Sequence, residues 1–428
     1  MKNQMTYDQA LEYLNSRQMF GTKMGLERIA KLMQYLGDPQ KQLKFVHIAG
    51  TNGKGSTSSF VYHIIKEAGY KVGLFTSPYI QRFNERIQVG EQEITNDEIV
   101  QILTQIRDII EQNWSKEEGP TWFEVLTAMC FVYFKNQNCD IVVLEVGLGG
   151  DLDSTNVIDK SEVSVITTIS YDHMEVLGNT LEEIAAKKAG IIKQNGTVVV
   201  YPQGDSVTEV IKDKCNKQDA TMNLVNPINI VPKTYDLQGQ TFSYKNIDYS
   251  IKMLGQYQVY NASVAIEAVL QLSKMEISVE HIQKGLEKAT WPGRMELLSK
   301  EPLFLLDGAH NIQGATTLVS NMRILFPNRK FIFIVGFLAH KEYEKMLAQV
   351  MPMAKHFITV TPVNEKAMKA QDLAVYIESK GGKATPSSSV SGAIDLALEM
   401  AKTEEGNCIC AFGSLYYIGM VRDYFGLR

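Results

Sequence analysis

The chain has 428 residues, of which 45% are hydrophobic and 21% are charged, values close to the average for globular proteins. This composition argues against a disordered chain, and the length suggests roughly two or three domains. The net charge of −5 gives no reason to expect nucleic acid, because phosphate backbones bind clustered lysine and arginine. No apolar run reaches the roughly 18 residues of a membrane span, and the polar N-terminus does not resemble a secretory signal. We therefore expect a cytoplasmic protein with no membrane partner.

The cysteines are expected to be buried, reduced thiols. Their number is odd, and no two of them are spaced as Cys-x-x-Cys. Four of them lie in apolar runs, where free cysteine behaves as a small hydrophobic residue. The five residues are Cys130, Cys139, Cys215, Cys408 and Cys410.

Between residues 45 and 201, apolar runs of strand length alternate with longer amphipathic stretches. Strands that alternate with helices need crossover connections, and this pattern predicts a mostly parallel sheet. The expected strands are Phe45–Ala49, Lys71–Thr76, Asp140–Val146, Val163–Ile169 and Thr197–Tyr201. The expected helices are Ser56–Ala68, Thr95–Asn113, Thr121–Asn136 and Thr180–Ala189.

The second half of the chain predicts a smaller α/β domain. Residues 221–254 are polar with period-two patches, which predicts an antiparallel element at the edge of the first domain. Helices are expected at 256–273 and 279–288, before Pro292 and Gly293 interrupt the pattern. We place the domains at residues 1–295 and 296–428. The strands expected in the second domain are Leu303–Leu306, Lys330–Val335, His356–Thr361 and Asn407–Phe412.

A glycine-rich segment directly follows the expected strand Phe45–Ala49 and precedes a helix that begins at Ser56 or Thr57. Strand, loop and helix in this order are typical of a phosphate-binding loop, in which backbone N–H groups and the helix N-terminus face the phosphates. A lysine in the loop would contact the β- and γ-phosphates. The spacing departs from the common GxxxxGK[ST] motif, because a glycine follows the lysine. The segment is Gly50, Thr51, Asn52, Gly53, Lys54, Gly55 and Ser56.

Carboxylates are expected beside this loop. Glu145 ends the strand that begins at Asp140, and it leads into a glycine-rich tail with Asp151 and Asp153. Since ligands gather at the carboxyl ends of parallel strands, Glu145 could hold Mg²⁺ there. Ser77 follows the preceding strand at the same edge, and its hydroxyl could be a second ligand.

Two further motifs fall near the same edge. Asp172 and His173 follow the strand Val163–Ile169, so we expect His173 to take part in the site. Lys187 and Lys188 end a helix before Gly190. On physical grounds alone, these lysines are explained by the helix dipole and by a glycine cap.

In the second domain, Asp307 and His310 follow a strand, and we expect them to reach a cleft between the domains. Arg294 in the linker could bridge to phosphate, and Ser414 ends the last strand.

Together these motifs resemble the Mur ligase superfamily and, within it, the folylpolyglutamate synthases. They occur in the order of that family and span nearly the whole chain. The resemblance implies an α/β fold, with a P-loop parallel-sheet ATPase domain followed by a smaller Rossmann-like α/β domain. The motifs are TNGKGS from Thr51, SPYIQRFNERI from Ser77, EVGLGGDLDSTN from Glu145, YDH from Tyr171, KAGI from Lys188, the segment Tyr257–Asn261, PGRME from Pro292, LDGAHN from Leu306, FGSLY from Phe412 and GLERI from Gly25.

The resemblance implies an ATP-dependent amide ligation. The terminal γ-carboxylate of a reduced folate would attack the γ-phosphate of ATP and become an acyl phosphate. The amino group of L-glutamate would then displace phosphate. Such a reaction mainly needs positioning and neutralisation of charge by lysine and Mg²⁺.

The family's site residues carry over by position. Lys54 and the loop glycines match the residues that bind the triphosphate, and Lys188 matches a lysine that CO₂ converts to a carbamate, which reverses the helix-end interpretation. A carbamate offers two oxygens to a metal, whereas an ammonium offers none, so the pKa of Lys188 must be lowered. The expected metal ligands are Ser77, Glu145, His173 and carbamylated Lys188.

The remaining residues are expected to contact substrates. Asn261, Arg294 and Asp307 resemble nucleotide contacts, and catalytic His310 and Ser414 would face glutamate in the second domain. Departures occur near the expected pterin region, where Tyr79 replaces the common His or Phe and Tyr171 replaces Leu. Both tyrosines would affect substrate preference rather than chemistry, and Tyr79 and Arg82 are expected substrate contacts.

Several alternatives stay open at this point. Dihydrofolate synthase, which joins glutamate to dihydropteroate, has the same chemistry and could be the only or a second activity. A cell-wall amino-acid ligase fits less well, because the segments from Gly25 and Phe83 look folate-type. A P-loop hydrolase or switch and a non-catalytic nucleotide-binding scaffold are the other classes. We expect a monomer whose partners are small molecules.

Overall fold

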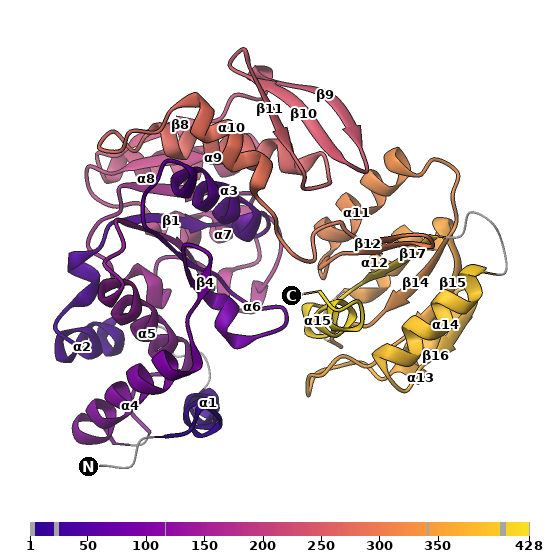
Figure 1. The fold of residues 1–428 in the computed structure, drawn as a ribbon, viewed down its shortest axis with the longest axis horizontal. Coiled ribbons are helices and arrows are strands. Elements are labelled where there is room, and N and C mark those ends of the chain that lie inside the picture. The colour runs from indigo at the N-terminus through magenta and orange to yellow at the C-terminus, as the bar shows by residue number, and fades with distance from the viewer. Residues whose placement is uncertain (1–4, 21–24, 116, 340–341, 403–407, 428) are drawn as a thin grey trace. The chain divides into compact units, whose positions relative to one another are not determined.

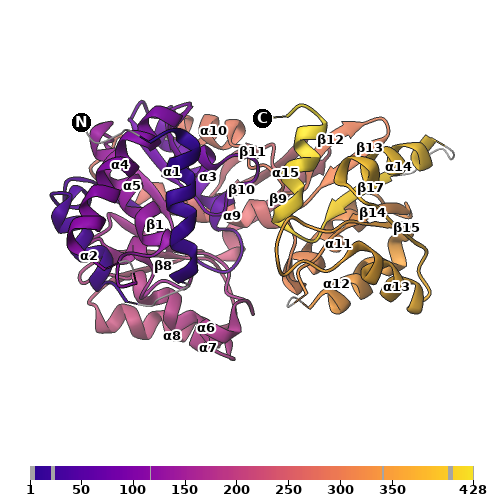
Figure 2. The same cartoon turned by 90° about the horizontal axis from the view of Figure 1, so that it is seen from below.

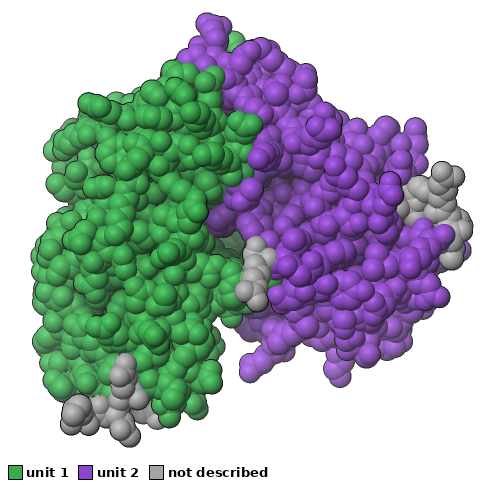
Figure 3. Space-filling view, in the orientation of Figure 1, with its two compact units in different colours: residues 1–230, 260–289 green, residues 231–259, 290–428 purple. Residues whose placement is uncertain are grey.

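The computed structural model describes residues 5–20, 25–115, 117–339, 342–402 and 408–427. Contacts divide the chain into two compact units, which Figure 3 shows in different colours. Unit 1 comprises residues 1–230 and 260–289, and unit 2 comprises residues 231–259 and 290–428.

Unit 1 is built on an eight-stranded sheet with the strand order β4-β3-β2-β5-β1-β6-β7-β8. Figure 1 labels β1, β4 and β8 of this sheet. Neighbouring strands are parallel across six positions of the sheet, in the order β2, β5, β1, β6, β7 and β8. At one edge, β3 pairs antiparallel with β2 and with β4. β1 and β5 are buried throughout, and apart from His47 and Glu145 all their residues are apolar, as expected for a parallel sheet covered on both faces. The strands are β1 (Phe45–Ala49), β2 (Val72–Phe75), β3 (Ile87–Val89), β4 (Gln92–Glu93), β5 (Ile141–Glu145), β6 (Val163–Ile166), β7 (Thr197–Val200) and β8 (Thr221–Leu224).

The helices of unit 1 begin where the sequence supplies a capping box. The pairs Thr95–Glu98, Thr121–Glu124 and Thr180–Glu183 each exchange side-chain and backbone hydrogen bonds, which satisfies N–H groups that a helix start leaves unpaired. Helices α7 and α8 pack side by side (Figure 2). The helices are α1 (Tyr7–Ser16), α2 (Glu27–Tyr35), α3 (Lys54–Glu67), α4 (Asn96–Asn113), α5 (Trp122–Asn136), α6 (Met174–Leu177), α7 (Leu181–Lys188), α8 (Asp205–Lys217), α9 (Tyr257–Leu270), whose first three residues belong to unit 2, and α10 (Val279–Lys288).

Helix α3, which starts at the phosphate loop, is packed closely against α10. A Cβ on Gly285 of α10 would lie 2.4 Å from the Cα of Ile64, so only glycine allows the two backbones to approach this closely. This contact supports α3 near its C-terminal end.

Unit 2 contains a three-stranded and a six-stranded sheet. The six-stranded sheet has the order β12-β13-β17-β14-β15-β16, and all neighbours are parallel except β12 with β13. The strands are β9 (Ile230–Asp236), β10 (Gly239–Tyr244), β11 (Ile247–Ile251), β12 (Glu296–Lys300), β13 (Leu303–Leu306), β14 (Phe331–Val335), β15 (Ala354–Thr359), β16 (Ala384–Pro386) and β17 (Cys408–Phe412). The helices are α11 (Ile312–Leu325), α12 (Tyr343–Val350), α13 (Ala370–Ser379), α14 (Val390–Lys402) and α15 (Leu415–Tyr424).

The expectation for the cysteines is confirmed, since all five are unpaired and buried. Burial raises the pKa of Cys139 to about 12 and that of Cys215 to about 11. No helix among the described residues has the length and apolar character needed to cross a membrane.

The elements differ from the expected ones in several places. Helix α3 begins at Lys54 rather than at Ser56 or Thr57, because Gly55 falls in the first turn, where backbone N–H groups need no helical partner. Strand β8 joins the parallel sheet of unit 1, although it begins the segment expected to be antiparallel. The antiparallel element itself groups with unit 2 and not with the first domain. Residue Asn407, the first of an expected strand, lies outside the described residues.

Candidate functional site

The expected phosphate loop lies at the carboxyl end of β1, between the ends of β5 and β6. Gly50 has φ +153° and Gly53 has φ +86°, conformations that side chains rarely adopt. A Cβ on Gly53 would lie 2.8 Å from Oδ1 of Asn261, which places this expected nucleotide contact against the loop. The loop therefore exposes its backbone at the edge of the sheet where parallel α/β folds bind ligands.

The segment that follows β6 holds the phosphate loop by hydrogen bonds. The Thr51 amide donates to the Thr168 carbonyl over 2.7 Å. The Thr51 hydroxyl donates to the Ser170 carbonyl and accepts from the Ser170 amide, over 3.1 and 3.0 Å. The same segment continues into Asp172 and His173, so the loop and these two residues share one support.

Two lysines converge on one carbonyl oxygen of the loop. The Nζ of Lys188 donates to the Gly50 carbonyl over 2.8 Å, and the Nζ of Lys54 donates to the same oxygen over 3.2 Å. Lys188 is 4% exposed. Burial, together with the nearby charge of Lys54, lowers the pKa of Lys188 from 10.5 to about 7, although Asp172 opposes this shift. A large fraction of Lys188 is therefore the neutral amine at neutral pH.

The glycine-rich tail after β5 fixes the position of Lys188. The Asp151 amide donates to the Lys187 carbonyl over 2.9 Å, and Lys187 forms an ion pair with the Asp151 carboxylate at 3.1 Å. A Cβ on Gly150 would lie 2.7 Å from the carbonyl oxygen of Lys188, so this close backbone contact requires glycine. Lys187 thus has a structural role, whereas Lys188 points at the phosphate loop.

Glu145 and Ser77 are brought together as the parallel sheet predicts. The Ser77 amide donates to Oε2 of Glu145 over 3.1 Å, and Glu145 is 4% exposed. His173 has φ +50°, precedes the short helix α6, and has a half-exposed side chain near Asp172 and Glu175. Among the described residues, no three His, Cys, Asp or Glu side chains form a group suited to a metal. The expected site would use only two ligands of these types, with a serine hydroxyl and a carbamate.

A buried polar network, which the sequence analysis did not predict, links His47 of β1 to Thr155 and Asp153. The Nε2 of His47 lies 2.9 Å from the Thr155 hydroxyl, which donates to the Asp153 carboxylate over 2.5 Å. Because that hydroxyl gives its proton to Asp153, it accepts from the Nε2–H of His47. Burial lowers the pKa of His47 from 6.5 to about 3, so this histidine is neutral. Burial also raises the pKa of Asp153, which has three hydrogen bonds to its carboxylate.

The expected substrate residues lie on the segment between β2 and β3. Tyr79 is 40% exposed, whereas Arg82 forms an ion pair with Glu93 at 2.6 Å. Arg86 was not among the expected residues, yet its guanidinium lies 4.8 Å from the ring centre of Tyr79 and 5.0 Å from that of Trp122. This cation between two aromatic rings orients Tyr79.

In unit 2, the expected residues gather at the carboxyl ends of β13 and β17. Asp307 accepts hydrogen bonds from the amides of Met295 and Ala309, each over 2.8 Å, and it is 6% exposed. Burial raises the pKa of Asp307, and the charge of Arg294 opposes this shift. The Nδ1 of His310 lies 2.8 Å from the Gly308 carbonyl, which fixes the ring.

Ser414 begins helix α15, and its hydroxyl accepts from the Tyr416 amide over 3.3 Å. Each unit therefore presents a group of expected site residues at the carboxyl edge of its own parallel sheet.

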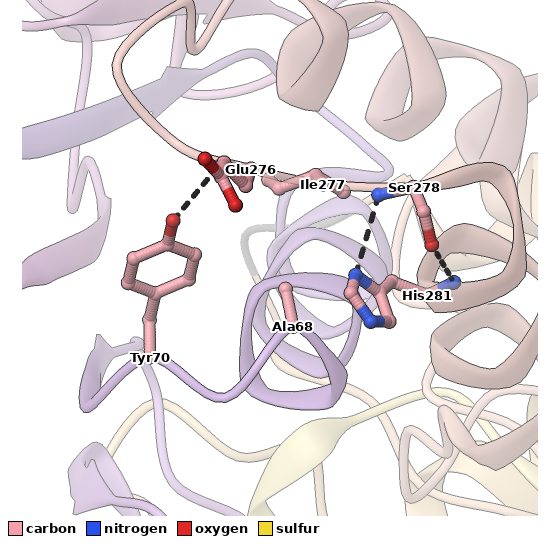
Figure 4. A pocket seen from close by; sticks show the side chains of 6 residues that line it. All are labelled: Ala68, Tyr70, Glu276, Ile277, Ser278 and His281. Carbon is pink, nitrogen blue, oxygen red and sulfur yellow. Dashed lines mark hydrogen bonds between the residues drawn. The ribbon is translucent and has the colours of Figure 1, made fainter.

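A separate depression in unit 1 is lined by residues from the end of α3 and the start of α10 (Figure 4). The Tyr70 hydroxyl accepts from the Glu276 amide over 2.7 Å, and Nδ1 of His281 accepts from the Ser278 amide over 3.2 Å. No expected site residue lines this depression. Ser278 and His281 form the capping box of α10, and Tyr70 holds the segment that precedes it.

Comparison with known proteins decides the family. Residues 48–269 match the Mur ligase middle domain, and residues 293–415 match the Mur ligase glutamate ligase domain. The chain belongs to the Mur ligase family. This result confirms the resemblance that the motifs predicted, and the two-domain α/β fold class is confirmed as well.

Two relatives and one solved structure match between 80% and 99% of this chain. Over 431 residues, the chain is 36% identical to the dihydrofolate synthase/folylpolyglutamate synthase of Bacillus subtilis, covering 97% of this chain and 98% of that protein. It is 35% identical over 353 residues to the folylpolyglutamate synthase of Lacticaseibacillus casei, covering 80% and 82%. The folylpolyglutamate synthase of Mycobacterium tuberculosis, solved in complex with ADP and AMPPCP, superimposes with a TM-score of 0.90 at 28% identity over 99% of both chains.

Proposed function

We propose that this Mur ligase family member is an ATP-dependent ligase that adds L-glutamate to the γ-carboxylate of tetrahydrofolate polyglutamates. The names of its relatives support this activity, and the complex of the M. tuberculosis enzyme with ADP and AMPPCP supports a nucleotide substrate. The observation that carries the proposal is the phosphate loop, on which Lys54 and Lys188 converge next to the end of β5.

In the proposed reaction, a γ-carboxylate oxygen of the folate attacks the γ-phosphorus of ATP, and ADP leaves with the bridging oxygen. The loop residues 50–56 bind the triphosphate, and Lys54 turns from the Gly50 carbonyl to the phosphates. The amine of L-glutamate then attacks the acyl carbon, loses a proton, and expels inorganic phosphate. Positioning and charge neutralisation supply most of the rate in such transfers.

The residues at the edge of the sheet fit Mg²⁺. Glu145 and Ser77 are in contact, since the Ser77 amide donates to the Glu145 carboxylate. The carboxylate of Glu145 and the hydroxyl of Ser77 are oxygen ligands of the kind that Mg²⁺ prefers. We propose Ser77, Glu145, His173 and carbamylated Lys188 as the metal ligands. When bound, Mg²⁺ would neutralise the negative charge of the phosphates.

We propose that CO₂ modifies Lys188. The neutral amine attacks the carbon of CO₂, an N–C bond forms, one C=O pair moves onto oxygen, and the nitrogen loses a proton. The lowered pKa of Lys188 supports this step, since only the neutral amine has the required lone pair. The hydrogen bond from Lys188 to the Gly50 carbonyl supports a carbamate beside the phosphate loop.

We propose that Arg294 and Asp307 of the second unit and Asn261 of unit 1 contact the nucleotide. His310 and Ser414 would face L-glutamate, and Tyr79 and Arg82 would contact the folate. The proposed division of labour is an ATP-binding domain at residues 1–295 and a glutamate-ligase domain at 296–428. A monomer in the cytoplasm, with no nucleic-acid partner, stays our expectation.

Dihydrofolate synthase is a second candidate activity, and the double name of the B. subtilis relative favours it. It uses the same site, with dihydropteroate as the acceptor carboxylate. One experiment tests both activities: purified protein receives ATP, Mg²⁺ and L-glutamate, with tetrahydrofolate or dihydropteroate added separately, and products are identified by mass. We expect glutamylated tetrahydrofolate. Phosphate release that is independent of both acceptors would instead indicate a hydrolase or switch.

A further inference from the structure

Two hydroxyl groups outside the expected site hold the carbonyl of Asn52. The Thr167 hydroxyl donates to this oxygen over 2.8 Å, and the Thr168 hydroxyl donates to it over 3.0 Å. The Thr167 hydroxyl also lies 3.2 Å from the Ala49 carbonyl, so it contacts both the start and the middle of the phosphate loop. Thr167 is fully buried, whereas Thr168 is partly exposed.

Because the peptide bond is planar, the position of the Asn52 carbonyl also fixes the direction of the Gly53 amide. In a trans peptide, the C=O of one residue and the N–H of the next point in opposite directions. Because Thr167 and Thr168 draw the Asn52 carbonyl toward the end of β6, the Gly53 amide is turned away from them. Gly53 precedes α3, where the free N–H groups of the first turn face an anion.

The neighbouring peptide has the same kind of support. The Gly50 carbonyl accepts from Lys188 and Lys54, and on its opposite side the Thr51 amide donates to the Thr168 carbonyl. The segment after β6 thus binds the Thr51 amide, which is then not available to a ligand. It also directs the Asn52 carbonyl toward itself. The amide of Gly53 is left for the ligand side.

We propose that Thr167 and Thr168 are positioning residues that orient the Asn52–Gly53 peptide, so that the Gly53 amide donates to the nucleotide polyphosphate. The inference rests on the proposed function, since it assumes that ATP binds the loop. Neither threonine touches the ligand. Both act through the Asn52 carbonyl, which their hydroxyls hold beside the backbone bridge between Asn52 and Thr168.

The test compares variants that differ by one hydroxyl. Thr167→Val and Thr168→Val remove the donor at nearly constant volume, and Thr167→Ser and Thr168→Ser keep it. Losing a hydrogen bond that orients a charged contact should weaken ATP binding about five- to tenfold in each Val variant. We expect the KM for ATP to rise with the dissociation constant, the KM for L-glutamate to stay constant, and the Ser variants to bind ATP within about twofold of wild type.

Isothermal titration with MgATP and steady-state kinetics supply these values, and a thermal melt checks that each variant is folded. The partly exposed Thr168 provides the test if the buried Thr167→Val variant unfolds. Val variants that are folded and bind ATP as wild type would overturn the inference while leaving the proposed function intact. The same holds if Ser variants lose as much affinity as Val variants. Failure of the wild type to bind ATP would overturn both.

Discussion

His47 should make unit 1 sensitive to mild acid. It lies fully buried in β1, three residues before the phosphate loop, and donates to Thr155. Protonation would place a charge in the core with no acidic partner in direct contact, since Thr155 separates it from Asp153. His47→Gln keeps an N–H donor for Thr155 but removes the titration.

The magnitude follows from the difference in proton binding between the unfolded and folded chains. With a pKa of 6.5 unfolded and about 3 folded, the unfolded chain binds more protons between these values. Stability therefore rises with pH across this window and is lost as pH falls below 6.5. Between pH 7.5 and pH 5.0, His47 should lower the free energy of unfolding by about 2 kcal/mol.

Urea unfolding can isolate this effect in unit 1. The chain has three tryptophans, and in a Trp291→Phe background the remaining two, Trp114 and Trp122, both report on unit 1. We expect the wild type to lose about 2 kcal/mol more than His47→Gln between pH 7.5 and 5.0. Other titrating groups are common to both proteins and cancel. Equal losses in the two proteins would refute the assignment of a low pKa to His47.

Three other predictions concern single side chains. Gly50→Ala would place a Cβ 1.8 Å from the Thr167 hydroxyl, so we expect ATP affinity, measured by titration, to fall by more than about tenfold. An unchanged affinity would contradict the close contact between Gly50 and Thr167. Gly285→Ala would force α10 away from Ile64 and should cost about 1–3 kcal/mol in urea unfolding, while the KM for ATP stays constant. Lys188→Met should abolish ligation. In CO₂-free buffer at pH 7 it should also raise the free energy of unfolding of unit 1 by up to about 4 kcal/mol, because burial lowers the pKa of the Lys188 amine and so opposes its protonated form in the folded chain. A Lys188→Met variant with a lower free energy of unfolding than wild type would argue against an energetic cost of burying the Lys188 amine.

Much of the site could be predicted because parallel sheets bring strand ends together. Glu145 and Ser77 are 68 residues apart in the chain, yet the rule for carboxyl ends placed them side by side. The strand expected to extend to Ile169 ends at Ile166, since the residues that follow bond to the phosphate loop instead of continuing the sheet. No local pattern carries that information.

Lys188 shows where local rules point the wrong way. A lysine at the end of α7, two residues before Gly190, fits a solvated helix terminus. Its burial arises from the Gly147–Asp153 loop and from the phosphate loop, whose Gly50 is 138 residues away in sequence. The burial of an ionisable group depends on such long-range packing, so only the family resemblance supplied its role. The threonines after β6 had no such signal and were missed.

The buried cysteines have a practical consequence for spectroscopy. Since all five thiols are shielded, and burial holds the pKa of Cys139 and Cys215 well above neutral pH, maleimide and methanethiosulfonate reagents should ignore the native chain. A cysteine introduced at exposed Lys212 in unit 1 and another at exposed Lys380 in unit 2 would then take labels selectively. Distances between the two labels, measured with and without nucleotide, would reveal domain motion in a background that needs no prior removal of native thiols.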